Sequence, residues 1–272
     1  MEMNAKRQLS DLPSALQARD EIAARLEGKR PVVFLDYDGT LTPIVERPEL
    51  AILAPEIRAI VRALAERCTV AVVSGRDRLD IEKLVGVEGL VFAGSHGFDI
   101  ASPDGRSIQN EIGADFGDLI RNVTARAVKE LASVEGSLVE PKRSSVALHY
   151  RLVAEDEAPR VKAVVDAILA DHADLRVTSG KKVWEIQPRI DWNKGKAVLW
   201  LLEALNVDQP DVVPFYFGDD VTDEDAFRAL KGRGIGVYVG HPDDVEACRE
   251  TVADYALRTS DEVGSFLDGL AR

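Results

Sequence analysis

The stretch FLDYDGTLTP, residues 34–43, places two carboxylates at the end of an apolar run. The run begins at Val32, and Asp36 and Asp38 follow it with one residue between them before the chain turns at Gly39. Residues two apart in a strand project to the same side, so the two carboxylates would meet at the strand end. Two carboxylates at such a short distance raise each other's pKa unless a cation lies between them. The stretch therefore predicts a buried strand that ends in a pair of neighbouring carboxylates.

Three interpretations of this pair remain open from the stretch alone. In a catalytic interpretation the carboxylates hold a divalent cation, one acting as a nucleophile and the other as an acid or base. In a structural interpretation they form a helix N-cap or an Asx turn, since Asp-Gly is a common turn dipeptide. An Asp-x-Asp pattern also occurs at the metal sites of sugar-nucleotide transferases.

Composition limits the class of protein and of partner. The chain has 272 residues, of which 46% are hydrophobic and 30% charged, as in a globular protein with either one domain and an insertion or two modest domains. Its formal net charge of −13 argues against nucleic acid or an anionic membrane as the main partner. A small anionic ligand needs only local positive charge and stays open. The sequence predicts no particular oligomeric state.

Cysteine usage and the N-terminal segment bear on location. Cys68 and Cys248 lie far apart without metal-ligand spacing, which is typical of reduced thiols in a cytosolic protein. Residues 1–26 lack the continuous apolar stretch of a signal peptide, and no run approaches the ~18 apolar residues of a membrane span. We therefore expect a cytoplasmic protein. Residues 12–26 are predicted to form an amphipathic helix that Gly28 ends.

Short apolar runs alternate with helical patterns toward both ends of the chain. Strand-and-turn patterns occupy 31–39, 68–76, 89–97, 211–220 and 234–240, and helical patterns occupy 54–67, 76–86, 194–205 and 223–230. Continuous apolar strands separated by helices indicate a parallel sheet covered on both faces. Such sheets bind ligands beyond the carboxyl ends of their strands, where this chain carries Asp36, Ser74, Gly94 and Asp219.

The middle of the chain, residues 107–187, follows a different pattern. Helical patterns there flank segments such as 146–150, whose alternation is typical of antiparallel strands with one covered face. We therefore predict an α/β fold in which residues 1–106 and 188–272 form a core around a parallel sheet. Residues 107–187 would form an inserted α+β domain.

A second acidic cluster lies in GDDVTDEDAF, residues 218–227. Asp219 and Asp220 end an apolar run, and Asp223 follows within one helical turn. Such a cluster is unfavourable unless the acids bind a cation or cap the next helix. Asp223 and the two acids after it suit the positive N-terminus of that helix. Two acidic strand ends in one sheet nevertheless favour an oxygen-ligand magnesium site over capping alone.

Two further features suit a bound anion. Ser74 and Gly75 end a strand and open a helix, where backbone N–H groups can meet a phosphate oxygen, although Ser-Gly is also a plain turn. Lys194 lies at a predicted helix start, where a cation is unfavourable because it opposes the macrodipole. An anion bound nearby would explain its position better. Lys196 is the competing candidate.

Together these segments resemble the four motifs of the haloacid dehalogenase superfamily of phosphatases. The motifs occur in the superfamily's order as DYDGTLTPI (36–44), SGR (74–76), NKGKA (193–197) and GDDVTDEDAF (218–227). The resemblance implies a Rossmann-like parallel sheet core with a cap domain inserted between the second and third motifs, as in the superfamily's capped sugar phosphatases.

The resemblance also implies roles. Asp36 would be the nucleophile that attacks phosphorus, and Asp38 would protonate the leaving oxygen and then deprotonate water. Mg²⁺ would be held by Asp36, the backbone carbonyl of Asp38 and Asp219, with Asp220 and Asp223 in support. The phosphoryl group would be held by Thr40, Ser74, Gly75 and Lys194, the last also being catalytic.

Within the superfamily the chain most resembles the trehalose-6-phosphate phosphatases. The resemblance lies in DYDGTLTPI, GSHGFDI (94–100), VEPKRSSVALHYR (139–151), GKKVWEIQP (180–188) and NKGKAV (193–198). It implies hydrolysis of trehalose 6-phosphate in trehalose biosynthesis. Charged side chains discriminate polyols well, and the implied sugar contacts are Glu140, Lys142, Arg151, Lys181 and Glu185 of the cap, with Gly97 and the backbone around His96.

Other functions stay in view. Another sugar phosphatase or a phosphomannomutase-like enzyme would share the same motifs. A phospho-accepting receiver module also joins acids, Mg²⁺ and a lysine, but it needs its acceptor on an interior strand and no inserted domain. A non-catalytic sugar-binding subunit is disfavoured because the expected catalytic residues are intact.

Overall fold

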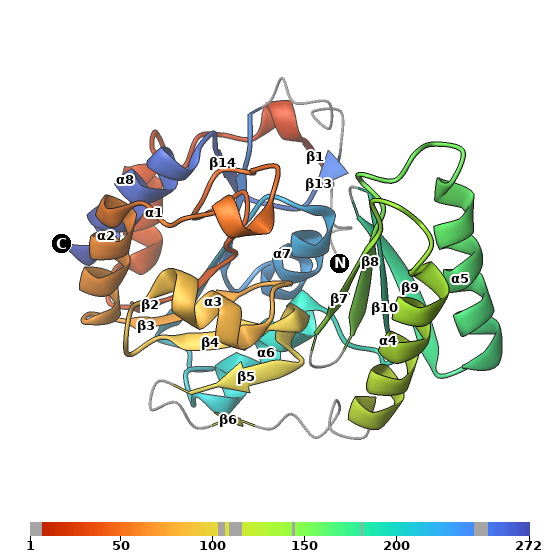
Figure 1. Ribbon diagram of the computed structural model, residues 1–272. Helices are drawn as coiled ribbons and strands as arrows, with labels where there is room; N and C mark the ends of the chain where they lie inside the picture. The colour runs from red at the N-terminus through yellow and green to blue at the C-terminus, as the bar shows by residue number, and fades with distance from the viewer. Residues whose placement is uncertain (1–6, 103–106, 109–115, 143–144, 181, 242–249) are drawn as a thin grey trace. The chain divides into compact units, whose positions relative to one another are not determined.

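The computed structural model describes residues 7–102, 107–108, 116–142, 145–180, 182–241 and 250–272 (Figure 1). The chain divides into two compact units. Met1–Ser107 and Trp192–Arg272 form the first, here called the core unit, and Ile108–Asp191 form the second, here called the inserted unit. The expected boundaries, 106/107 and 187/188, lie close to this division.

The core unit is built on one large sheet. Its strand order is β14 (Tyr255–Leu257), β12 (Ile235–Val239), β11 (Val212–Gly218), β2 (Arg30–Leu35), β3 (Thr69–Val73), β4 (Val91–Gly94), β5 (Asp99–Ala101) and β6 (Ser107–Ile108). The six strands from β14 to β4 are parallel, and β5 is antiparallel to β4. A small separate sheet pairs β1 (Arg7–Gln8) with β13 (Glu250–Thr251).

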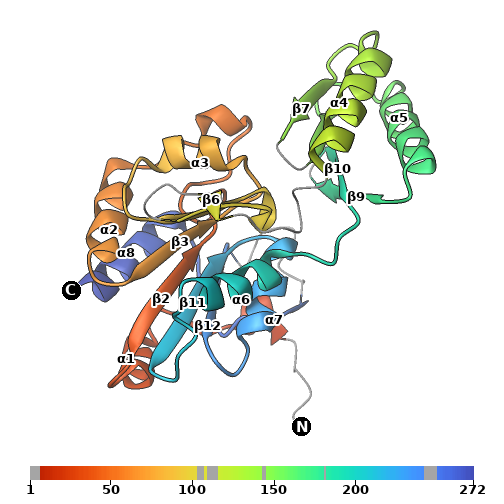
Figure 2. The same ribbon diagram turned by 90° about the horizontal axis from the view of Figure 1, so that it is seen from below.

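Helices cover both faces of the large sheet, as Figure 2 shows. One buried apolar cluster joins α1 (Arg19–Leu26), α2 (Pro55–Ala65), α3 (Arg78–Val85) and α8 (Ser260–Ala271) to one face. The other face carries α6 (Lys194–Ala204) and α7 (Glu224–Leu230). The described part of the core unit also contains the short 3₁₀ helices η1 (Leu9–Asp11), η2 (Pro48–Leu50), η3 (Ser95–Gly97) and η5 (Val221–Asp223). The predicted α/β fold with a doubly covered parallel sheet is confirmed.

Burial on both faces explains why the strands read as continuous apolar runs. Every residue of β11 is buried. Phe215 and Phe217 stack on one face and contact Phe266 of α8, whereas Tyr216 points to the other face and meets Phe227 of α7 edge-on. Such a strand has no solvent side, so its sequence shows no alternation.

The predicted N-terminal helix is shorter than expected. The helix α1 covers only Arg19–Leu26, so the prediction of a helix over 12–26 is wrong in its first half. Pro13 and Ala15 exchange backbone hydrogen bonds with Ala256 of the sheet's edge strand. These hydrogen bonds tie the start of the segment to the sheet edge, and a turn at residues 15–18 then leads into α1. The stop at Gly28 is as expected, with φ at +69°.

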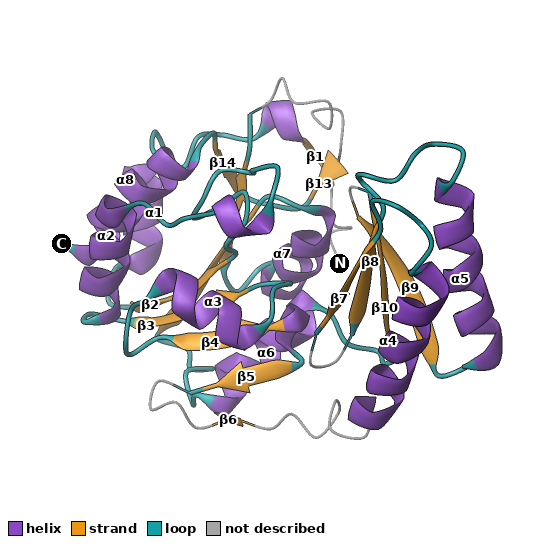
Figure 3. Cartoon of the chain, viewed as in Figure 1, coloured by secondary structure: helices purple, strands orange, loops and turns teal. Residues whose placement is uncertain are grey.

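The inserted unit is an α+β layer, and its helices and strands can be followed by colour in Figure 3. Its sheet has the order β7 (Leu138–Pro141), β8 (Val146–His149), β10 (Val183–Pro188) and β9 (Leu175–Gly180), with each pair antiparallel. The helices α4 (Gly117–Leu131) and α5 (Ala158–Asp171) pack on one face through a separate apolar cluster. The predicted alternation therefore reflects one covered face.

The strand register gives the opposite face of this sheet a polar character. Glu140 lies opposite Ala147, and Ala147 lies opposite Glu185. Side chains directly opposite one another share a face. Val146 and Leu148 point the other way, into the apolar cluster.

None of the described helices combines the length and the hydropathy that crossing a membrane requires.

Candidate active site

The candidate site lies at the carboxyl ends of three adjacent strands, β11, β2 and β3. Asp219 follows β11, Asp36 follows β2 and Ser74 follows β3. The N–H of Asp36 donates to the carbonyl of Phe217 at 2.9 Å, so the ladder between β2 and β11 continues to the first carboxylate. The sheet thus brings residues from distant parts of the sequence to one edge, as predicted for a parallel sheet.

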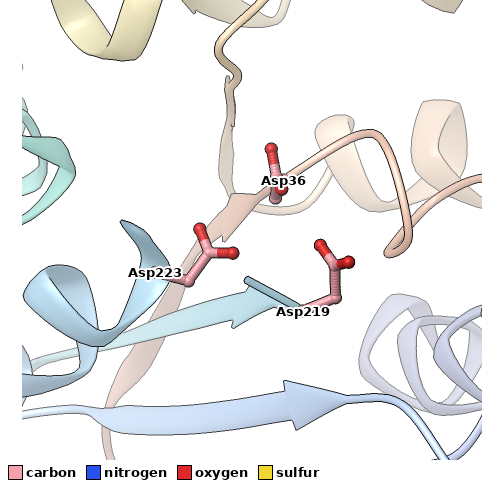
Figure 4. A group of neighbouring side chains, drawn as sticks. All are labelled: Asp36, Asp219 and Asp223. Carbon is pink, nitrogen blue, oxygen red and sulfur yellow. The ribbon is translucent and has the colours of Figure 1, made fainter. Parts of the chain in front are cut away.

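Three carboxylates surround a common space at this edge (Figure 4). One oxygen each of Asp36, Asp219 and Asp223 lies within 4.8 Å of the others. Gly39 borders the cluster, because a Cβ at residue 39 would overlap the Asp219 carboxylate. An all-oxygen donor set of this kind fits a hard divalent cation. The arrangement can therefore hold a metal ion between the end of β2 and the end of β11.

Lys194 lies among these acids. Its side chain is only 3% exposed, and Nζ is 2.6 Å from Oδ1 of Asp223 and 3.2 Å from Oδ2 of Asp36. It is the first residue of α6, whose N-cap Asn193 accepts a hydrogen bond from the backbone N–H of Lys196. Of the two lysines considered, Lys194 is thus the one placed in the acidic cluster.

Burial and like charge shift the pKa values of this cluster. Burial raises the pKa of Asp36 to about 7, Lys194 opposes the shift, and Asp223 adds to it. Burial also raises the pKa of Asp219 well above its usual value, and the neighbouring carboxylates Asp36 and Asp223 raise it further. Burial lowers the pKa of Lys194, but Asp223 and Asp36 outweigh it and the net pKa is raised. One lysine therefore leaves uncompensated negative charge, which a cation would neutralise.

Asp223 is held more tightly than the sequence suggested. Its Oδ1 accepts hydrogen bonds from Lys194 Nζ and from Tyr216 Oη, both at 2.6 Å. Its Oδ2 accepts the backbone N–H of Asp220 at 2.9 Å. Tyr216 was not among the residues predicted for the site. The one signal for it is a hydroxyl-bearing side chain inside the otherwise apolar run VVPFYF.

Asp220 has a capping role in this structure. Its exposed side chain accepts the N–H of Val221 at 2.6 Å and forms a capping box with Asp223 around η5. The acid cluster among the described residues comprises Asp36, Asp219 and Asp223 without it. The structural interpretation therefore fits Asp220 better than a place near the cation.

Asp38 makes a bidentate ion pair with Arg76, which was not predicted from the sequence. Arg76 Nε donates to Oδ2 at 2.7 Å, and Arg76 Nη2 donates to Oδ1 at 2.6 Å. The guanidinium also lies over the Tyr37 ring at 5.4 Å and donates to the carbonyl of Pro48. The side chain of Arg76 is 11% exposed and that of Asp38 is 44% exposed. A largely buried arginine thus fixes the orientation of the more accessible acid.

The residues expected around the phosphoryl group lie beside this pair. The Thr40 hydroxyl is fully buried and makes no hydrogen bond within the described part of the chain, so an oxygen of a bound anion can accept from it. Ser74 is buried, and its hydroxyl accepts the N–H of Arg76 at 3.2 Å, which leaves its own proton to donate. The His96 ring occupies the space that a side chain at Gly75 would need.

The GSHG turn after β4 has an unusual backbone. Ser95, His96 and Gly97 have φ values of +50°, +57° and +91°, a conformation that costs free energy for residues other than glycine. The N–H of His96 donates to the carbonyl of Ser74 at 2.9 Å. The turn therefore fixes the loop after β3. Its position at the strand end suits the sugar contact that was predicted for the backbone around His96.

Three of the five sugar-binding residues predicted in the cap lie in the inserted unit's sheet region. Lys142 Nζ is 3.3 Å from Glu185 Oε1, and Glu140 Oε2 is 2.7 Å from His149 Nε2. Ser145 Oγ donates to Glu185 at 2.6 Å. Ser145 and His149 were not predicted, although both occur in the quoted run 139–151.

The other two predicted cap residues are placed differently. Arg151 lies in an exposed turn after β8 and not in the sheet. Lys181 lies outside the described residues.

Comparison with known proteins shows the family to which this chain belongs. The family model for trehalose-phosphatases matches residues 34–261. The trehalose-phosphate phosphatase of Mycobacterium bovis (strain BCG / Pasteur 1173P2) is 43% identical over 267 residues, covering 98% of this chain and 67% of the relative. That of Mycobacterium avium (strain 104) is 42% identical over 269 residues, covering 97% of this chain and 68% of the relative.

Solved structures of related proteins have the same fold as this chain. The C-terminal domain of the C. albicans trehalose-6-phosphate phosphatase superposes with a TM-score of 0.73 at 25% identity, covering 96% of this chain and 98% of that chain. A haloacid dehalogenase-like hydrolase from Bacteroides thetaiotaomicron, at 16% identity, has a TM-score of 0.58 and covers 88% of this chain and 97% of that one. The haloacid dehalogenase-like fold predicted from the four motifs is confirmed. Since the family match begins within β2 and continues to the start of α8, the chain belongs to the trehalose-phosphatase family and is a phosphoric monoester hydrolase.

Proposed function

We propose that this chain hydrolyses trehalose 6-phosphate to trehalose and phosphate in a Mg²⁺-dependent reaction that passes through an aspartyl-phosphate. The observation that carries the proposal is the placement of Lys194 between Asp36 and Asp223, next to Asp219, at one edge of the parallel sheet. Family membership supplies the substrate, since the relatives are named trehalose-phosphate phosphatases.

In the first half of the reaction Asp36 attacks phosphorus. A carboxylate oxygen of Asp36 forms a bond to phosphorus, the bond from phosphorus to the sugar oxygen breaks, and Asp38 gives that oxygen a proton. Lys194 and the hydroxyls of Thr40 and Ser74 would hold the other phosphoryl oxygens, where the transition state carries its charge.

In the second half water replaces the aspartate. Asp38, now a carboxylate, takes a proton from a water molecule, the water oxygen bonds to phosphorus, and the bond to Asp36 breaks to release phosphate. Asp36 and Asp219 would hold the Mg²⁺, with the backbone carbonyl of Asp38 as the further expected ligand. Bound Mg²⁺ would reduce the repulsion between the Asp36 carboxylate and the phosphate. Because Asp223 already accepts three hydrogen bonds, we assign it to Lys194 before the cation.

Sugar recognition is the part of the proposal that the inserted unit would supply. The ion pair of Lys142 with Glu185 and the pair of Glu140 with His149 place donors and acceptors at fixed spacing on one sheet face. Paired polar groups of this kind discriminate strongly against a ligand that lacks matching hydroxyls. Arg151 and Lys181 remain predicted sugar contacts, as do His96 and Gly97 of the core unit.

We also propose the cytosol as the location. The proposal follows from the cysteine usage of the sequence. It is supported by Cys68, which is a free thiol.

Phosphate release across a panel of sugar phosphates tests this function. Trehalose 6-phosphate should exceed mannose 6-phosphate and glucose 6-phosphate by at least about tenfold in kcat/KM, or ~1.4 kcal/mol. A chelator should abolish the activity, and added Mg²⁺ should restore it. A smaller preference would favour another sugar phosphatase. A phosphoryl group that moves between sugar positions without release would favour the mutase-like alternative. No turnover of any sugar phosphate would favour a receiver module or a silent sugar-binding subunit.

A further inference from the structure

A phenol hydroxyl lies deep beneath the candidate site. Tyr216 is completely buried in β11, and its ring meets Phe227 of α7 edge-on, with centroids 5.8 Å apart. A buried hydroxyl costs free energy unless it is hydrogen-bonded. The neighbouring strand positions are phenylalanines, so the ring alone could be supplied without the oxygen. The hydroxyl therefore calls for an explanation that packing does not give.

The hydroxyl is bonded to the carboxylate that also holds the catalytic lysine. Tyr216 Oη donates to Asp223 Oδ1 at 2.6 Å, and Lys194 Nζ donates to the same oxygen at 2.6 Å. Lys194 in turn lies 3.2 Å from Asp36 Oδ2. The side chains of Tyr216 and Asp223 are completely buried. A continuous chain of contacts thus runs from the middle of β11 to the expected nucleophile.

The Tyr216 hydroxyl limits what Asp223 can do. One oxygen of Asp223 is shared by two donors, and the other accepts the N–H of Asp220. A carboxylate with fixed donors on both oxygens cannot rotate without breaking hydrogen bonds, which is costly in a buried site. Loss of the phenol donor would free one side of Oδ1. Asp223 could then turn, and the ammonium group of Lys194 would follow it away from Asp36.

We propose that Tyr216 is a positioning residue that acts through Asp223 to hold Lys194 in place for phosphoryl transfer. This inference deepens the proposed function and rests on it for its catalytic consequence. Tyr216 does not touch substrate, so its effect belongs in kcat and not in KM. It donates no ligand to a cation, and Asp223 is assigned to Lys194 before the cation, so affinity for Mg²⁺ should depend on it far less than kcat does.

The variant Tyr216→Phe removes only the hydroxyl, and Tyr255→Phe is its matched control. Tyr255 lies in edge strand β14, outside the acidic cluster. Its side chain is also buried, and its hydroxyl donates to Glu21 of α1 at 2.8 Å. With trehalose 6-phosphate and Mg²⁺, Tyr216→Phe should lower kcat by about tenfold or more, as expected for a lost hydrogen bond to a charged group. KM and the calorimetric Kd for Mg²⁺ should stay within about twofold. Tyr255→Phe should keep the kcat of the wild type.

A second readout does not depend on turnover. The ammonium resonance of buried Lys194, assigned by its absence in Lys194→Met, should move in ¹H–¹⁵N spectra of Tyr216→Phe and stay in place in Tyr255→Phe. An unmoved resonance would overturn the inference whether or not the protein is active. A wild type that releases no phosphate would instead count only against the proposed function.

A double variant separates an effect that runs through Asp223 from a general loss of stability in Tyr216→Phe. If Tyr216 acts through Asp223, adding Tyr216→Phe to Asp223→Asn should lower kcat by less than about twofold beyond Asp223→Asn alone. Effects that multiply would show that Tyr216 acts by another route and would overturn the inference. Equal losses of kcat in Tyr216→Phe and Tyr255→Phe would do the same, because they would indicate a general effect of losing a buried hydroxyl.

Discussion

At the scale of single residues, the two aspartates of the first motif have opposite surroundings. Asp36 is buried beside Lys194, and burial raises its pKa to about 7. Asp38 is about half exposed and is clamped by Arg76 through both oxygens. A nucleophile must face the metal and phosphorus, whereas an acid must reach the leaving oxygen and solvent. The different surroundings suit these different tasks.

Arg76 should matter for turnover because it sets the orientation of Asp38. Each Asp38 oxygen accepts one hydrogen bond from Arg76 and keeps a second lone pair for a proton. The fixed orientation of the carboxyl group therefore favours proton transfer. Arg76→Lys keeps the charge but loses the fork, and Arg76→Met loses both. We expect kcat to fall by roughly tenfold in Arg76→Lys and further in Arg76→Met, with KM changed less. Steady-state phosphate release measures both.

The control for Arg76 lies at the start of β2, the strand that Asp36 and Asp38 follow. Arg30 begins β2 and makes an exposed ion pair with Asp211 at 3.0 Å. Exposed pairs contribute little, so Arg30→Met should keep kcat within about twofold. Equal activity in the two Arg76 variants and wild type would contradict the role given to Arg76.

At the scale of elements, the contact between α6 and α7 holds the lysine against its partner. Gly195 follows Lys194 in α6, and a Cβ at residue 195 would overlap the backbone carbonyl of Asp225 in α7. Lys194 and Asp223 approach each other across this contact. The close approach of the two helix N-termini therefore sets the distance between the two side chains.

The variant Gly195→Ala should push these helices apart. Overpacking of this kind costs about 1–3 kcal/mol of stability, and the displacement of Lys194 should lower kcat by roughly tenfold or more. Calorimetric unfolding and phosphate release measure the two effects.

Gly269→Ala in α8 is the matched control for Gly195→Ala. A Cβ there would have only Arg19 side-chain atoms at 3.9 Å, so the variant should be neutral or stabilised by up to ~1 kcal/mol. If Gly195→Ala behaves like this control, the contact between α6 and α7 does not set the position of the lysine.

Helices and strands could be predicted from the sequence better than the contacts between distant side chains. The parallel strands were predictable because burial on both faces leaves continuous apolar runs. The antiparallel strand β5 was not, since it has three residues and carries buried Asp99, which pairs with Arg78 of α3. The predicted N-terminal helix is too long because hydrophobic spacing does not show that the carbonyl of Pro13 accepts a hydrogen bond from the sheet's edge strand.

Within the site, the acids and the lysine could be predicted because their residue types and strand-end positions are unusual. The partners of these residues could not. Arg76 lies 38 positions from Asp38, and Tyr216 looks like another apolar strand residue until the fold places Asp223 beside its hydroxyl. Sequence spacing does not separate a capping carboxylate from a metal ligand, so the cap that Asp220 forms on η5 could not be predicted either.

At the scale of the whole molecule, the site makes stability depend on pH and on the cation. Without a cation, burial raises the pKa of Asp36 from 3.8 to about 7, against the opposing effect of Lys194. Between these values the folded protein keeps a proton that the unfolded chain has lost. The stability that Asp36 contributes is therefore fully present below about pH 4 and is lost as the pH rises through about 7.

A divalent cation should therefore stabilise the protein more at high pH than at low pH. Mg²⁺ binds the deprotonated carboxylate, so at about pH 5 it must displace the proton, whereas at about pH 8 it binds a site already charged. Saturating Mg²⁺ should raise Tm by several degrees at about pH 8 and by clearly less at about pH 5. Scanning calorimetry at matched ionic strength makes the comparison, because the net charge of −13 also responds to salt.

The variant Asp36→Asn provides the control for this pH dependence. It removes the titrating carboxylate, so the difference between the two pH values should shrink. An increase in Tm that is the same at both pH values, or that persists unchanged in Asp36→Asn, would place the cation elsewhere.

The same variant tests the central claim, that Asp36 is the nucleophile of a phosphatase. Asp36→Asn keeps the shape of the side chain and removes its charge. Without Mg²⁺ at about pH 8 the variant should be at least as stable as the wild type, because it no longer buries a carboxylate whose pKa burial raises. Phosphate release from trehalose 6-phosphate with Mg²⁺, compared between wild type and Asp36→Asn, should show at least about a thousandfold loss of kcat in a folded protein. A folded Asp36→Asn that turns over within about tenfold of the wild type would contradict the account.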